Sequence, residues 1–159
     1  MNREQQEAFM REAIQLSISN INSCNGGPFG AVIVKDGQII ARGANSVTST
    51  NDPTAHAEVV AIRQACENLH TFQLTGCEIY ASCEPCPMCL GAIYWARLDK
   101  LYYANTKNDA AAIKFDDKFI YEELEKPLED RTLFTRQLLR DEALEAFNKW
   151  SAMEQKIEY

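Results

Sequence analysis

Ser82-Cys83-Glu84-Pro85-Cys86-Pro87-Met88-Cys89 is a run of three cysteines at three-residue spacing, and His56-Ala57-Glu58 lies upstream of it. Two thiolates and an imidazole form a ligand set that suits zinc. Three protein ligands leave one tetrahedral position for water, which is the pattern of catalytic rather than structural zinc sites. The two motifs therefore predict a metal site at which Glu58 lies beside that water.

The prolines indicate which cysteine pair binds the metal. Pro87 fits the first position of a helix, because the first helical amides have no partner within the helix. A helix over residues 87–96 places Cys86 at its N-terminus and Cys89 in its first turn, where the positive end of the helix lowers thiol pKa values. We therefore predict Cys86 and Cys89 as ligands. Cys83 is interpreted as a small, buried loop residue near the site.

Other cysteine chemistry fits less well. An iron–sulfur run needs a fourth cysteine shortly after Cys89, and the sequence has none there. A C-x-x-C pair also occurs in redox proteins, so a redox site stays an alternative. A structural zinc site needs a fourth ligand, and the remaining candidates show no paired spacing: Cys24, Cys66, Cys77 and His70.

The His56 segment is predicted to be helical. Asp52 can cap a helix that begins at Pro53 and runs through His56 to Cys66. A lone histidine in an apolar helix is commonly a core residue, but here it has cysteine partners and an acid two positions later. The neighbours of Glu58 are small or apolar, which argues against a solvated surface acid.

The rest of the chain alternates between helical and extended patterns. An amphipathic helix is predicted over residues 3–22, and an Asp36-Gly37 turn joins antiparallel strands at 29–34 and 38–43. Further strands are predicted at 77–82 and 100–104, and helices at 119–125 and 141–155, whereas 131–140 is ambiguous and 157–159 is a free end. This alternation indicates an α/β fold in which a largely parallel half-sheet is joined to the first hairpin.

Composition bounds the class of protein. The 159 residues suffice for one domain, and 46% of them are hydrophobic, as in globular proteins. No apolar run approaches the ~20 residues of a membrane helix, and the N-terminal residues do not form a signal peptide. Clustered cysteines at metal spacing predict a reducing, cytoplasmic location. The net charge of −7 argues against a nucleic-acid partner.

Three further positions allow two interpretations each. Asn45 follows the second strand and either forms a turn or recognises a ligand's edge with its amide. Phe29 either packs in the core or flanks a ring. In Phe115-Asp116-Asp117, at least one of the acids is interpreted as the cap of the helix at 119–125.

With these motifs in place, the chain resembles the cytidine and deoxycytidylate deaminase superfamily, whose signature combines H-x-E with P-C-x-x-C. Its late stretches resemble the guanine-specific branch. The matching stretches are Gly26-Gly27-Pro28-Phe29-Gly30-Ala31-Val32-Ile33-Val34, Asn51-Asp52-Pro53-Thr54-Ala55-His56-Ala57-Glu58, residues 82–97, Phe115-Asp116-Asp117 and Glu158-Tyr159.

The resemblance implies a single deaminase domain over residues 1–159, built as a three-layer α/β/α sandwich around a mixed five-stranded sheet. It implies hydrolytic loss of ammonia from guanine, giving xanthine, with one zinc ion per subunit held by His56, Cys86 and Cys89. Glu58 is then the proton shuttle and Asp117 a second acid.

The resemblance also implies how the base is bound and how the chain assembles. Phe29 and Asn45 are expected to recognise a small purine base. The C-terminal segment, about residues 141–159, is expected to be exchanged in a homodimer, so that the partner subunit's Tyr159 closes the pocket.

Two other functions remain open from the residues. One is deamination of another substrate, such as cytosine, a triazine or pterin ring, or adenosine in tRNA. The other is a zinc-stabilised binding module without catalysis. Glu58 argues against the second, because a structural zinc site has no use for an acid there, and the acidic composition argues against tRNA.

Overall fold

A computed structural model describes residues 2–115 and 117–159 of the chain. Asp116, which the sequence offered as a helix cap, lies outside the described residues. The chain divides into two compact units, Met1–Lys118 and Phe119–Tyr159, and each is described by itself.

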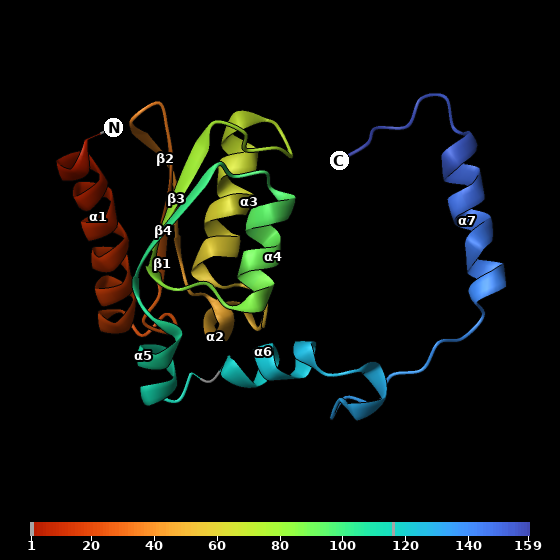
Figure 1. The fold of residues 1–159 in the computed structure, drawn as a ribbon. Helices are drawn as coiled ribbons and strands as arrows, with labels where there is room; N and C mark the ends of the chain where they lie inside the picture. The colour runs from red at the N-terminus through yellow and green to blue at the C-terminus, as the bar shows by residue number, and fades with distance from the viewer. Residues whose placement is uncertain (1, 116) are drawn as a thin grey trace. The chain divides into compact units, whose positions relative to one another are not determined.

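The first unit is built on a mixed sheet of β1 (Gly30–Lys35), β2 (Gln38–Ala44), β3 (Cys77–Cys83) and β4 (Lys100–Asn105). In the order β2-β1-β3-β4, β1 runs antiparallel to both of its neighbours, and β4 runs parallel to β3 (Figure 1). The predicted hairpin turn is confirmed, with positive φ at Asp36 and Gly37. The mixed sheet implied by the family resemblance is therefore present.

Helices cover both faces of the sheet. Helix α1 (Arg3–Asn22) packs against β1 and β3, and α3 (Ala57–Leu69) packs against β1 and β2 from the opposite side (Figure 1). Helix α4 (Pro87–Trp95) lies beside α3 and shares its core with β3. Because side chains alternate along a strand, β3 sends Ile79 into the α3 core and Tyr80 into the α1 core. The three-layer α/β/α architecture is confirmed.

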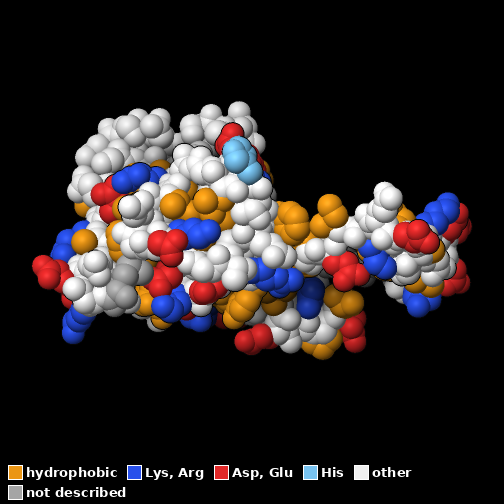
Figure 2. Space-filling model, turned by 90° about the horizontal axis from the view of Figure 1, so that it is seen from above, with side chains coloured by type: hydrophobic (Ala, Val, Ile, Leu, Met, Phe, Trp, Pro, Cys, Tyr) orange, Lys and Arg blue, Asp and Glu red, His pale blue; other side chains and the backbone are white. Residues whose placement is uncertain are grey.

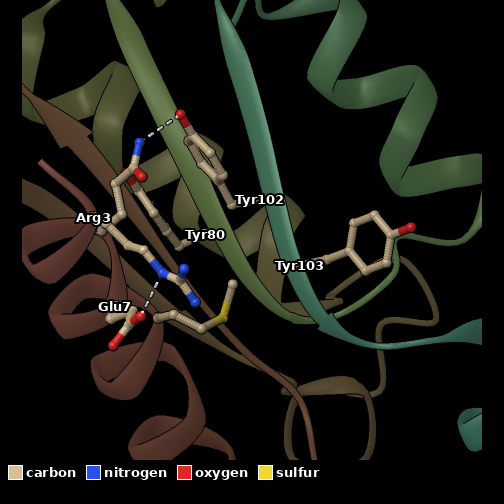
Figure 3. A pocket seen from close by; sticks show the side chains of 7 residues that line it. Arg3, Glu7, Tyr80, Tyr102 and Tyr103 are labelled. Atoms are coloured by element: carbon tan, nitrogen blue, oxygen red, sulfur yellow. Dashed lines mark hydrogen bonds and ion pairs between the residues drawn. The ribbon is translucent and has the colours of Figure 1, made fainter. Parts of the chain in front are cut away.

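The α1 face of the sheet carries a shallow hollow of about 260 Å³ (Figure 3). Its floor is the stacked pair Tyr80 and Tyr102, with ring centroids 4.7 Å apart. Gln6 donates a hydrogen bond from Nε2 to the Tyr102 hydroxyl at 2.9 Å. The hollow therefore belongs to the packing of α1 on the sheet, on the face opposite α3 and α4.

The expected strand count was wrong, since the sheet of the described residues has four strands rather than five. After β4 the chain enters α5 (Lys107–Ala112), which Thr106 and Asp109 cap reciprocally. Residues 134–139 form neither helix nor strand. A strand forms only beside a partner strand, and within the described chain β4 has none on its outer side.

The predicted start of the second helix was also wrong. Asp52 does not cap it, because its carboxylate accepts hydrogen bonds from the Thr54 amide at 2.8 Å and the Thr54 hydroxyl at 2.7 Å. The Asp52 carboxylate is used in this local turn and is not available to cap a helix. Helix α3 therefore begins only after His56, which is its N-cap residue. The loop before it contains a short helix, α2 (Val47–Thr50).

Helix α6 (Lys118–Glu125) begins at the last residue of the first unit, and its other residues belong to the second unit. The second unit also contains the 3₁₀ turn η1 (Leu128–Asp130) and α7 (Arg140–Ala152). Glu123 organises its first part, accepting from Lys126 at 2.6 Å and from the Thr132 amide and hydroxyl at 2.7 Å each. The Lys126 ammonium, with Thr132, lowers the pKa of Glu123 to about 2. None of the helices in residues 2–115 and 117–159 has the length and apolar character to cross a bilayer.

Helix α3 approaches strand β2 closely at Gly43. A Cβ there would lie 2.1 Å from the Ala57 carbonyl oxygen and 2.6 Å from the Ala61 amide nitrogen. Gly43→Ala is therefore expected to destabilise the fold by about 1–3 kcal/mol. Urea unfolding measures the effect against Gly91→Ala, since a Cβ at Gly91 meets no described atom within 4 Å. Equal stability of the two variants would contradict the close packing.

Candidate active site

Three predicted ligands meet at the ends of two helices. His56 is the N-cap of α3, Cys86 is the N-cap of α4, and Cys89 lies in the first turn of α4. His56 Nδ1 lies 3.6 Å from Cys86 Sγ and 3.5 Å from Cys89 Sγ. Both cysteines are free thiols rather than a disulfide. The fold thus brings together two distant segments with their donor atoms facing one another.

The geometry of these donors fits a zinc ion. Zn–S distances of about 2.3 Å and Zn–N distances of about 2.0–2.1 Å at a tetrahedral angle separate sulfur from nitrogen by about 3.6 Å. The observed separations are 3.5 and 3.6 Å, and the three donor atoms all lie within 4.8 Å of one another. The set offers three ligands and leaves a fourth position open, as in catalytic zinc sites.

Local structure favours a thiolate at Cys86. Pro87 occupies the first position of α4, as predicted, so Cys86 is the N-cap and lies at the positive end of the helix dipole. The hydrogen bond from the Cys89 thiol, assisted by His56, lowers the pKa of Cys86 to about 4. The same interaction with Cys86 raises the pKa of Cys89. One of the two sulfurs is therefore already charged before a metal replaces the proton of the other.

Glu58 is the buried acid of the site. Only 7% of its surface is exposed, and its Oε2 accepts from the Cys89 thiol at 3.5 Å. Burial raises the pKa of Glu58. Because Glu58 lies in the first turn of α3, two residues after His56, the helix places the acid beside the ligand cluster. This burial contradicts the interpretation of Glu58 as a solvated surface acid.

Asn45 and Phe29 lie together at the ends of β2 and β1. Asn45 is buried, and its Oδ1 accepts from the amides of Gly27 at 3.1 Å and Val47 at 3.3 Å. The Phe29 ring meets Phe115 edge-on, with centroids 4.9 Å apart at 87°. Phe115 is a site candidate that sequence reasoning assigned no role, although its position beside two acids was a signal.

Asp117 comes close to the same cluster. The Cys86 thiolate raises the pKa of His56 most, and the charges of Glu58 and Asp117 contribute to the shift. Asp117 also raises the pKa of Cys83, secondary to burial, and its Oδ1 is buried. The structure therefore brings Asp117 within electrostatic reach of His56.

The sequence model of the "Cytidine and deoxycytidylate deaminase zinc-binding region" matches residues 3–105, from α1 to the end of β4. The chain belongs to this deaminase family. The three donor atoms and Glu58 lie in segments that the match covers.

Individual relatives extend the similarity beyond the family region. Guanine deaminase of Bacillus subtilis (strain 168) is 55% identical over 153 residues, which are 96% of this chain and 98% of the relative. The X-ray structure of guanine deaminase from Bacillus subtilis superposes with a TM-score of 0.94 at 54% identity, covering 100% of this chain and 99% of that one. The tRNA-specific adenosine deaminase of Aquifex aeolicus (strain VF5) is 49% identical over 77 residues, which are only 48% of this chain and 51% of the relative.

Two residues of the cysteine loop hold the deaminase site to the next segment. Cys83, predicted as a loop residue, is the last residue of β3 and donates from Sγ to the Thr106 carbonyl at 3.6 Å. Glu84 donates its amide to the Asn105 carbonyl at 2.8 Å and accepts from the Lys107 amide at 3.0 Å. These bonds fasten the loop to the chain that leads through α5 to Asp117. The Thr106-x-x-Asp109 capping pattern was the sequence signal for α5.

Tyr159 ends the second unit of the chain, and 70% of its side chain is exposed. Its place in a neighbouring subunit's pocket stays a prediction.

Proposed function

We propose that this chain is a zinc-dependent guanine deaminase, which hydrolyses guanine to xanthine and ammonia. The observation that carries the chemistry is the buried Glu58 carboxylate beside a set of three donors with zinc spacing. The full-length similarity to a guanine deaminase, at 96% of this chain, supports guanine as the substrate, because the tRNA-specific relatives match only 48–72% of the chain.

His56, Cys86 and Cys89 hold the metal in this proposal. A zinc ion held there would act as a Lewis acid and would lower the pKa of a water molecule from 15.7 toward about 7. The thiolate character of Cys86 and the free thiol of Cys89 supply the soft ligands that select zinc over magnesium or calcium.

Glu58 moves protons during the reaction. Its carboxylate accepts a proton from the attacking water and gives it to a ring nitrogen of guanine. The water oxygen forms a bond to the carbon that bears the exocyclic amine. That amine needs a proton before the carbon–nitrogen bond breaks and ammonia leaves. That proton comes from the new hydroxyl group, which becomes a carbonyl of xanthine as ammonia leaves. Asp117, close enough to affect the pKa of His56, relays it to the amine in this proposal.

Asn45 and the aromatic pair hold the base. Two backbone amides occupy Asn45 Oδ1, and the amide group is planar, so Nδ2 is directed away from them as a donor. Asn45 therefore recognises a hydrogen-bond acceptor on the edge of the purine. Phe29 and Phe115, packed edge-on, offer apolar surface to the purine face.

A substrate panel tests the proposed function. Purified zinc-loaded protein is incubated with guanine, adenine, cytosine and tRNA, and ammonia and the ultraviolet spectra of the products are measured. Xanthine and ammonia from guanine are expected. The face in Figure 2 shows acidic and basic side chains interspersed rather than a continuous basic surface, which supports a small substrate over tRNA. Ammonia from cytosine or tRNA but not from guanine would overturn the proposal.

We also propose that the protein acts as a homodimer that exchanges its C-terminal segment. Helix α7 leaves large apolar side chains exposed, with Phe147 at 70% and Trp150 at 42%, which fits a helix that packs on another surface. The outer side of β4 has no strand partner within the described chain, so an exchanged segment could pair there.

A cytoplasmic location is part of the same proposal. The free thiols that serve as ligands fit a reducing cytoplasm.

Removing residues 157–159 is expected to lower turnover, because the proposal places the partner subunit's Tyr159 over the pocket. Coexpression with full-length Glu58→Gln then tests the exchange. An exchanged mixed dimer combines the Glu58 of the shortened chain with an intact tail, so activity is expected to return. Full activity of the shortened protein alone would remove Tyr159 from the site. An inactive shortened protein without recovery would place the tail in its own subunit.

A further inference from the structure

Asn20 is a buried polar residue in the last turn of α1, with 6% of its surface exposed. Its amide nitrogen Nδ2 donates to the Gly27 carbonyl at 2.8 Å and to the Asn45 carbonyl at 2.9 Å. Both amide hydrogens are therefore used, and each is given to a different loop. A helix side chain that binds two backbone carbonyls in this way sets the distance between the loops.

Both carbonyls belong to the segments that carry the proposed base-binding residues. The Gly27 carbonyl also accepts from the Phe29 amide at 2.9 Å, and the Asn45 amide donates to the Phe29 carbonyl at 3.1 Å. Gly27 in turn donates its amide to Asn45 Oδ1 at 3.1 Å. Asn20 is thus the side chain from α1 that joins the network orienting the Asn45 amide.

The network has little space in which to shift. A Cβ at Gly26 would lie 2.0 Å from the Asn45 carbonyl oxygen and 2.8 Å from Asn45 Oδ1. The two loops are therefore in direct backbone contact. Without the Asn20 amide, the buried Asn45 carbonyl loses this donor and the half-buried Gly27 carbonyl keeps only the Phe29 amide. The side-chain link between the two loops is then lost, which separates the loops and turns the Asn45 side chain.

We propose that Asn20 is a positioning residue for substrate binding, acting through Asn45 without touching the base. The proposal rests on the proposed deamination of guanine, in which Asn45 recognises the purine edge. Asn20 contributes by holding the Asn45 amide donor at one angle and by holding the Phe29 backbone beside it.

A double-mutant cycle tests this role. Asn20→Ala is expected to lower kcat/KM for guanine by about tenfold, mainly through a higher KM, because one oriented hydrogen bond to the base is lost. Its zinc-to-protein ratio is expected to stay at the wild-type value. In an Asn45→Ala background the same substitution is expected to change kcat/KM by less than about twofold, because the two positions act through one contact. Equal effects in both backgrounds, or an unchanged kcat/KM, would overturn the proposal.

Ser17→Ala is the matched control. Ser17 is also buried in α1, at 8% exposed, but its hydroxyl donates to the Ile14 carbonyl within the same helix at 2.7 Å. The control is expected to lower stability and leave KM unchanged. A rise in KM for Ser17→Ala equal to that for Asn20→Ala would show general loosening of α1 and contradict the specific role.

Two further arms keep the outcome decisive. If Asn20→Ala does not fold, Asn20→Ser replaces it, since a hydroxyl donates only one hydrogen bond and is expected to give a smaller rise in KM. If the wild-type protein is inactive on guanine but active on another base of the panel, the proposed function fails. The same cycle on that base then decides whether Asn20 acts through Asn45.

Discussion

Replacing Glu58 by glutamine is expected to lower kcat for guanine by about 10²–10⁴-fold, the usual contribution of a positioned acid–base group. Glutamine matches the shape of glutamate but cannot take the proton from water. Glu58 is not among the three donors of the ligand cluster, so the variant is expected to keep its zinc. Steady-state kinetics and elemental analysis of the same preparation measure both properties.

Glu78→Gln is a sharp control, because Glu78 is equally buried, at 8% exposed against 7% for Glu58. Glu78 lies on the α1 face of the sheet and accepts from Tyr80 at 3.0 Å and Lys100 at 2.6 Å. Its variant is expected to lose stability and keep activity, whereas Glu58→Gln loses activity and keeps stability. Near-normal turnover by zinc-loaded Glu58→Gln would remove Glu58 from the chemistry.

Replacing Cys89 by alanine is expected to abolish zinc binding and turnover together. Cys89 is fully buried and its sulfur lies 3.5 Å from His56 Nδ1, so alanine removes one of the three donors and leaves only His56 and Cys86 to hold a metal. A bound metal also stabilises the fold, by about 2.7 kcal/mol when free zinc exceeds its Kd a hundredfold. For a chain of this size, each kcal/mol lost lowers Tm by about 2–4 °C.

Elemental analysis and thermal unfolding, each with and without added zinc, measure the loss. Cys83→Ala is the matched control, because Cys83 is a buried cysteine three residues before Cys86 and donates to a carbonyl instead of facing the cluster. It is expected to retain zinc. If Cys83→Ala released the metal while Cys89→Ala kept it, the ligand pair would be Cys83 and Cys86, and the proposed site would be wrong.

Local sequence signals predicted the elements that carry the site. Pro87 and the cysteine spacing predicted the start of α4, and the Asp36-Gly37 turn predicted the first hairpin. The helix predicted at residues 3–22 is α1 (Arg3–Asn22). These features succeed because each depends on neighbouring residues alone, through turn chemistry, helix capping or hydrophobic periodicity.

The failures all depend on contacts between distant residues, or on competition for one group. The number of strands in the sheet depends on whether another segment pairs with β4, and local sequence patterns do not predict such a long-range pairing. The start of α3 was misplaced because Asp52 bonds to Thr54 instead of capping the helix. Asn20 was missed because the periodicity of α1 marks its residues as packing positions. Only the folded chain shows that its amide meets Gly27 and Asn45.

The backbone contact between Gly26 and Asn45 restricts how the range of accepted bases can be redesigned. A Cβ at position 26 would collide with main-chain atoms of Asn45, so substitutions at this position are expected to destabilise the loop. Phe115 is the better position to randomise, because 43% of it is exposed while its ring still touches Phe29. Engineering for altered nucleobases therefore begins there.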